Sequence, residues 1–218
     1  GSLAQEVNVY DNFITLFQKN FASPINSSGL LYYRYYLVDS AAIDGKWCYN
    51  IMFKPRFKQA TAFTGNLWVN DTTFAVKKLD MRIVNDANVN FVNDYIISQD
   101  FDKVSDKHWM LTREKQMADF NIFEDAKKTT GFYGTRTLVY SGHSFEPPPD
   151  IKIYTMPTDI VVLNNAVLQT DDYWLKTRPE MLSHREESIY RLADTLLKMP
   201  VFNTYFDIAQ MIMTGYYV

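Results

Sequence analysis

Apolar and polar positions alternate in a series of short segments between residues 31 and 140, and turn residues separate the segments. Strict alternation places one side of a segment against a core and the other in solvent, because successive side chains of a strand point to opposite faces. The clearest case is residues 73–83, where Leu79, Met81 and Ile83 alternate with charged residues. Short connections between the segments predict an antiparallel meander in which sequential strands are neighbours.

Turn residues divide this region into predicted strands. Asp44-Gly45 and Asn70-Asp71 are hairpin signals, because Asp, Asn and Gly tolerate the positive φ angles of tight turns. In the segment that contains Trp68 we expect the indole to face inward and to be buried, because it is the bulkiest apolar group there. The predicted strands cover residues 31–39, 47–53, 62–70, 73–83, 91–101, 108–113 and 132–140.

A short helix is predicted before the meander, over residues 10–20. Phe13, Leu16 and Phe17 fall on one face at helical spacing, and Asp11 is a suitable N-cap.

The composition changes after the proline-rich segment 146–150, and the later residues predict helices. Ser183 and Glu186 form a capping box, in which each side chain satisfies a free backbone amide at the start of a helix. The apolar stripe that follows ends at Pro200, and residues 202–213 predict a second helix.

Together these patterns predict an α+β fold: a large, curved antiparallel sheet, meandering and half-barrel-like, with helices packed on one face. A length of 218 residues suits one large domain, so we expect a single domain over residues 1–218. Its sheet core would cover residues 31–145, and residues 150–218 would be mostly helical. Gly1 and Ser2 resemble a cloning scar, which indicates a fragment excised from a longer protein.

The composition indicates a globular, sheet-rich protein and limits the classes of molecule that it could bind. The chain is 47% hydrophobic and 22% charged, which is ordinary for a globular protein, and its aromatic content of 16% favours a sheet-rich structure. The net charge is −3 and the pI is about 5.6, which argues against a nucleic-acid surface.

Candidate catalytic and metal-binding residues are scattered. His108, His143 and His184 lie far apart and form none of the two-histidine spacings of zinc sites. The single cysteine, Cys48, excludes an internal disulfide and a CxxC metal site. The segment around Ser141 lacks the GxSxG order of a nucleophile elbow, so we interpret it as a polar turn. We therefore expect no catalytic residue, no metal and no cofactor.

An aromatic stripe on the first predicted strands has two interpretations. It is either ordinary sheet core or a concave apolar face that holds an acyl chain or a partner segment; we favour sheet core. Its members are Tyr33, Tyr35, Trp47, Tyr49, Phe53 and Trp68.

Several motifs in order resemble a known family. The motifs are IDGKWCYNIMFKPR at 43–56, FTGNLWV at 63–69, NVNFVND at 88–94, Tyr173-Trp174 with Arg178-Pro179, and Leu182-Ser183 with Glu186. This series resembles the middle region of uncharacterised Gram-negative outer-membrane proteins, a domain of unknown function. A weaker similarity, carried by the strand motif at 63–69, is to the half-barrels of lipoprotein carriers.

The family resemblance implies a cellular location but no catalytic or binding residues. In that family an N-terminal carboxypeptidase-regulatory-like domain precedes this region, and a C-terminal membrane β-barrel like that of TonB-dependent receptors follows it. The resemblance implies these domains of the same chain as partners, and the periplasmic face of the outer membrane as location. Residues 202–218 would then lead the chain toward the barrel, and Tyr216 and Tyr217 would suit a membrane interface.

We therefore expect a non-catalytic periplasmic module of an outer-membrane protein that binds or positions a partner. One alternative is a carrier-like domain that shields a lipid or acyl chain in a concave apolar face. The other is an enzyme whose site the fold assembles from scattered residues. A lipid or an envelope protein would be the further partner, and nucleic acid would not.

Overall fold

A computed structural model describes residues 7–58, 60–87, 89, 92–121, 131–147, 155 and 170–197. The chain divides into two compact units. One comprises residues 5–143, and the other comprises residues 1–4 and 144–218. The predicted helix over residues 202–213 and the segment 202–218 expected to lead toward a barrel lie outside the described residues.

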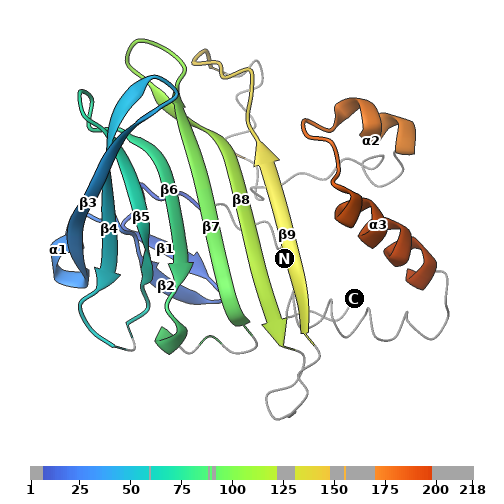
Figure 1. Ribbon diagram of the computed structural model, residues 1–218, viewed down its shortest axis with the longest axis horizontal. Coiled ribbons are helices and arrows are strands. Elements are labelled where there is room, and N and C mark those ends of the chain that lie inside the picture. Colours follow the sequence, from blue (N-terminus) through green and yellow to red (C-terminus); the bar gives the residue numbers. More distant parts are fainter. Residues whose placement is uncertain are drawn as a thin grey trace. The chain divides into compact units, whose positions relative to one another are not determined.

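The larger unit contains a seven-stranded antiparallel sheet in which every strand pairs with its neighbours in sequence (Figure 1). This confirms the predicted meander and the α+β class with a curved antiparallel sheet. The strands are β3 (Tyr33–Ile43), β4 (Lys46–Pro55), β5 (Phe63–Asn70), β6 (Val76–Ile83), β7 (Val92–Lys103), β8 (Trp109–Asn121) and β9 (Gly131–Val139).

Local irregularities mark the curved sheet. The register shifts between Leu37 and Asp39 on β3 and again next to Val69 on β5. Such bulges increase the local twist and bend of a sheet. The predicted turn at Asp44-Gly45 joins β3 to β4 with φ angles of 48° and 73°, as a two-residue hairpin turn requires.

The segment predicted as a helix over residues 10–20 is instead a β-hairpin, so that prediction was wrong. Strands β1 (Phe13–Leu16) and β2 (Lys19–Ala22) pair through a turn at Phe17 and Gln18, whose φ angles are 50° and 60°. The chain forms this turn without glycine, so the residue types gave no turn signal. Burial of Ile14 and Leu16 on one side of β1 follows a period of two.

This hairpin packs on the core face of the sheet, and Figure 1 shows it crossing behind the central strands. The Phe21 ring contacts that of Phe63 on β5 with 5.3 Å between centroids. The core joins residues before β3 with residues of the sheet in one buried cluster. Among its fully buried members are Val9, Leu16, Phe21, Tyr33, Phe53, Phe63, Leu79, Met81 and Ile97.

Two short elements complete the larger unit. The helix α1 (Gly29–Tyr32) precedes β3, so the strand begins at Tyr33 rather than at the predicted Leu31. The 3-10 turn η1 (Asn85–Ala87) follows β6.

The second unit contains the helices α2 (Asp171–Thr177) and α3 (His184–Leu197). The capping box predicted before α3 is confirmed: the Ser183 backbone amide donates to Glu186 Oε2 at 2.8 Å. In return the Glu186 amide donates to Ser183 Oγ at 3.3 Å. None of the described helices has the length and apolar character needed to span a lipid bilayer.

Candidate functional site

The core face of the sheet changes from apolar to polar along the strand order. The register sets side by side one residue from each strand: Leu37, Ile51, Leu67, Leu79, Gln99, Glu114 and Leu138. The adjacent row reads Tyr35, Phe53, Gly65, Met81, Ile97, Gln116 and Arg136. Strands β3 to β6 thus supply apolar groups to this face, and β7 to β9 supply most of its polar ones.

The polar residues of β7 and β8 form a buried hydrogen-bonded cluster. Glu114 accepts from Gln99 Nε2 at 2.6 Å and from Gln116 Nε2 at 2.7 Å, one bond to each carboxylate oxygen. The Tyr95 hydroxyl donates to Gln116 Oε1 at 2.9 Å. Gln99 Nε2 also donates to the Val7 carbonyl at 2.7 Å, which ties the segment before β1 to the sheet.

Burial controls the electrostatics of this cluster. The pKa of the Tyr95 hydroxyl is raised to about 12, chiefly by loss of hydration and also by the negative charge of Glu114, while Arg136 opposes the shift. Glu114 is almost fully buried and both of its oxygens accept hydrogen bonds. A carboxylate held in this way orders its neighbours, and it is poorly placed to exchange protons with a substrate.

The six aromatic residues predicted as a stripe differ in burial and in the face they occupy. Tyr33 and Phe53 are fully buried, and Tyr35 is partly buried against the core. The Tyr35 hydroxyl donates to the Pro24 carbonyl at 2.7 Å. Trp47 and Tyr49, near the start of β4, are 49% and 38% exposed, so they present aromatic surface to solvent.

Trp68 does not face the core, and the prediction that it does was wrong. The register pairs it with Asn50 on one side and Lys78 on the other, on the face opposite the hairpin. Its neighbour Leu67 is the buried residue, and Val69 packs against the core. Leu67 lies beside Ile51 and Leu79, and Val69 lies beside Tyr49 and Val76, so the inward side of β5 is lined by apolar neighbours.

Large apolar side chains are exposed along β3 and the helix before it. We name this surface the apolar edge; its residues are Leu30, Leu31, Tyr36, Leu37 and Val38. Leu37 is 70% exposed and Leu30 is equally open. Among the described residues, β3 pairs only with β4, so the backbone groups of its other side are free to bind an added strand.

A buried lysine on β6 connects the β3–β4 turn to β7. The Lys77 ammonium on β6 lies 2.8 Å from Asp44 Oδ2 in the turn and 2.6 Å from Asp102 Oδ1 on β7. Its side chain is 4% exposed. Burial acts to lower the pKa of Lys77, but the hydrogen bonds to Asp102 and Asp44 outweigh it and raise that pKa. Lys77 therefore remains charged and holds the turn in place.

The three histidines remain in separate surroundings. His108 Nδ1 lies 2.7 Å from Ser105 Oγ in the turn before β8, and His143 Nε2 lies 3.2 Å from the Leu111 carbonyl. His184 begins α3 in the other unit. In the part of the chain that the structure describes, no three His, Cys, Asp or Glu side chains are grouped as a metal would need.

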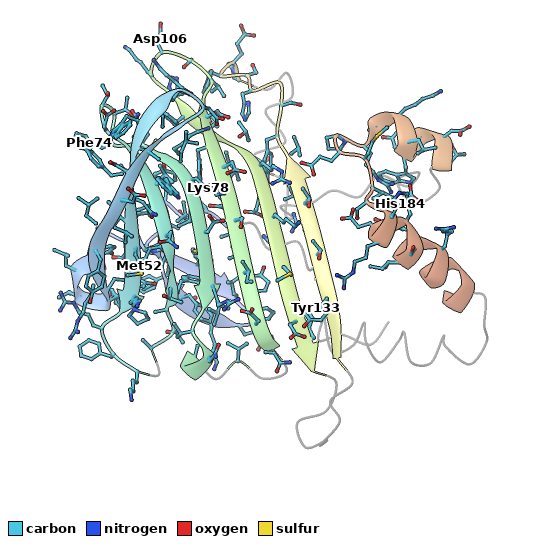
Figure 2. All side chains as sticks on the ribbon, viewed as in Figure 1. Met52, Phe74, Lys78, Asp106, Tyr133 and His184 are labelled. Carbon is cyan, nitrogen blue, oxygen red and sulfur yellow. The ribbon has the colours of Figure 1, made fainter. Side chains whose placement is uncertain are left out.

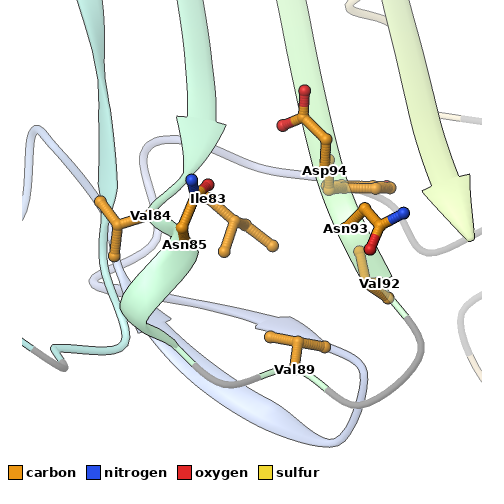
Figure 3. Close-up of a pocket in the computed structure, with 8 residues that line it drawn as sticks. Ile83, Val84, Asn85, Val89, Val92, Asn93 and Asp94 are labelled. Atoms are coloured by element: carbon orange, nitrogen blue, oxygen red, sulfur yellow. The ribbon is translucent and has the colours of Figure 1, made fainter. Parts of the chain in front are cut away.

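A small depression lies where β6 ends and β7 begins (Figure 3). It has room for about one water molecule. Its lining is Ile83, Val84, Asn85, Val89, Val92, Asn93, Asp94 and Tyr95. A depression of this size cannot hold an acyl chain.

The buried cluster of Gln99, Glu114 and Gln116 was not predicted from the sequence. Glu114 and Gln116 belong to a run on β8 that is polar on both faces, so alternation gives no inward signal for them. The one available signal was Gln99, which lies at an inward position between Ile97 and Phe101.

The chain matches the model of a protein family. A family model described as "Family of unknown function (DUF5686)" matches residues 2–137, which contain the first six strands of the sheet and nearly all of β9. No curated protein and no solved structure matches the chain.

Proposed function

Since this chain belongs to the DUF5686 family, a family of unknown function, we propose a role from the geometry of its residues: a non-catalytic module that positions a partner segment. The observation that carries the proposal is that the chain's own hairpin fills the core face of the sheet. Val9, Leu16 and Phe21 are buried against sheet residues there. A carrier keeps such a face open for its cargo, and here the hairpin covers the buried part of the face and leaves only its end at β3 and β4 partly exposed among the described residues.

The apolar edge is the surface on which the partner would dock. An edge strand of eleven residues with exposed Tyr36, Leu37 and Val38 is a template for strand addition. Its charge is low, because Arg34 and Asp39 are the only ionisable side chains of β3 besides its tyrosines. Contiguous exposed apolar surface of this kind marks an interaction site.

The proposed location is the periplasmic face of the outer membrane, between a regulatory-like domain and a membrane barrel of the same chain. This part of the proposal is supported by the motif series from residue 43 to residue 186 and by its resemblance to outer-membrane proteins. Protease treatment of cells carrying the full-length protein would test it. We expect cleavage only after the outer membrane is permeabilised, and cleavage in intact cells would contradict the proposed location.

Photo-crosslinking tests the docking role. A photoreactive amino acid at Val38 in the full-length protein should give a discrete adduct, and Leu37→Lys in the same protein should remove it. Tyr133 on β9 is the matched control, because it is 68% exposed on the opposite edge strand (Figure 2). No adduct from Val38, or the same adduct from Tyr133, would contradict the proposal.

A second measurement separates this role from the carrier alternative. A fluorescent fatty acid titrated into the purified chain should show no saturable binding, since the core face is packed. Saturable binding that Leu67→Trp blocks would favour the carrier.

A further inference from the structure

We infer that the partner of the apolar edge is a second copy of this chain, joined through antiparallel pairing of β3 with β3; this rests on the proposed docking role. The inference comes from the order of side chains along the strand. An edge strand that meets its own copy forms a two-fold symmetric ladder, in which each residue must suit the residue placed opposite it.

The bulge on β3 determines which residues would be opposed. In the pairing with β4, Leu37 lies opposite Ile51 and Asp39 lies opposite Asn50, while Tyr36 lies opposite Met52. Val38 therefore is the extra residue of the bulge and has no partner on β4. Asp39 therefore shares a face with Arg34 and Tyr36, and Leu37 shares the other face with Tyr35. A bulge on an edge commonly discourages pairing. Here it also places Asp39 on the same face as Arg34.

A two-fold axis at Tyr36 would give each paired residue from Arg34 to Asp39 a suitable residue opposite it on the copy. Tyr36 then lies opposite Tyr36 of the copy, and Tyr35 lies opposite Leu37. One rung farther, Arg34 lies opposite Asp39, so each end of the ladder carries one ion pair between copies. All three pairings join residues of the same face, as direct opposition in a sheet requires.

The charges of this strand are free for such pairing. Arg34 and Asp39 are both exposed, and among the described residues neither has an ion-pair partner. Asp39 accepts a hydrogen bond from the Ser40 amide at 2.7 Å. Opposite charges at mirrored positions are what an isologous interface needs to fix its register.

Side-chain sizes also complement one another. The bulky end of the edge, with Leu30 and Leu31 in α1, would lie beyond the Arg34 rung. On the copy, the corresponding positions beyond Asp39 are the small residues Ser40, Ala41 and Ala42. Large side chains of one copy would therefore meet small ones of the other.

Charge reversal in the full chain tests the inference. Sedimentation of the purified chain at rising concentration should show a monomer–dimer equilibrium. Arg34→Asp and Asp39→Arg should each weaken dimerisation about tenfold or more, and the double variant should restore it to within about threefold, because the reversed pair is again complementary. Lys115→Asp is the control, because Lys115 is exposed on β8 and lies far from β3 in the strand order, and it should leave the dissociation constant unchanged.

A cross-link at the axis gives an independent readout. Tyr36→Cys should form a disulfide between copies under mild oxidation, since opposed residues at a two-fold axis bring their Cβ atoms to about 4.5–5.5 Å. Tyr133→Cys should not. A monomer at all concentrations without the Tyr36→Cys cross-link would overturn the inference, as would a dimer that Arg34→Asp leaves intact. If Val38 still gives an adduct with another protein in cells, the docking role stands and only the identity of the partner is wrong.

Discussion

The Tyr33 hydroxyl accepts a hydrogen bond from the Phe63 backbone amide at 3.0 Å and donates one to the Ala22 carbonyl at 2.5 Å. A single buried phenol at the start of β3 thus connects the hairpin strand β2 to the sheet strand β5. The residues involved are distant in sequence, and the bonds form where the hairpin packs on the sheet.

Replacing Tyr33 by phenylalanine should destabilise the larger unit by about 2–4 kcal/mol, because a buried donor and a buried acceptor both lose their partner. Urea unfolding followed by tryptophan fluorescence measures the change. Tyr36→Phe removes an exposed hydroxyl and should change the free energy of unfolding by less than about 0.5 kcal/mol. Equal effects of the two substitutions would contradict the connecting role of Tyr33.

Gly65 allows β5 and β6 to approach closely. A Cβ at this position would overlap the Asp80 carbonyl oxygen and come within 2.8 Å of the Met81 Cα. Gly65→Ala should therefore cost about 2 kcal/mol or more, since backbone must move to admit the methyl group. Gly134→Ala on β9 is the control, because its added Cβ would meet only the Phe120 ring at 3.8 Å. Thermal melts that rank the two variants in the opposite order would contradict this account.

Leu67 and Trp68 should respond to truncation in the opposite order to their sizes. Leu67→Ala should cost about 2–5 kcal/mol as a core truncation. Trp68→Ala should cost less than Leu67→Ala, because the indole lies on the opposite face beside Asn50 and Lys78. Denaturant unfolding of both variants measures the two changes in the free energy of unfolding. A larger loss of stability for Trp68→Ala would contradict the placement of the indole outside the core.

Alkaline pH should weaken the fold through Tyr95. Its pKa rises from 10.0 to about 12 on folding, so the stabilisation is complete below pH 10 and is lost as pH rises toward 12. The free energy of unfolding should fall by about 1.4 kcal/mol per pH unit for each such group in that window. Tyr95→Phe lowers stability at neutral pH by removing the bond to Gln116, but its slope above pH 10 should be smaller by that amount. An unchanged slope would contradict the assignment.

Removing the carboxylates around Lys77 should cost more than removing the lysine. Asp44→Asn with Asp102→Asn leaves a charged ammonium buried without a counter-ion, which should cost about 2 kcal/mol or more. Lys77→Met leaves two carboxylates that reach solvent, so its cost should be smaller. Lys78→Met, at a half-exposed ion pair, is the control and should change stability by less than about 1 kcal/mol. Hydrogen exchange of the β3–β4 turn would show which variants release it.

Much of the fold could be predicted from the chain because its signals are local. Alternation predicted the strand order, Asp44-Gly45 predicted a hairpin turn, and Ser183 with Glu186 predicted the start of α3. The hairpin before β3 could not be predicted, since Phe13, Leu16 and Phe17 match helical spacing and its turn uses no glycine. Only packing of Ile14 and Leu16 against the sheet selects the strand pairing there.

The buried polar cluster and the apolar edge likewise depend partly on local sequence and partly on tertiary packing. The sequence by itself determined that an antiparallel sheet forms and which family motifs it carries, because period-two patterning and turn chemistry act over a few residues. The tertiary structure alone decided which face of that sheet is buried. It set Leu67 inward and Trp68 outward, gathered Gln99, Glu114 and Gln116 from two strands, and left Leu37 exposed at an edge. These outcomes depend on contacts between segments far apart in the chain, and their free energies appear only when the hairpin covers the sheet.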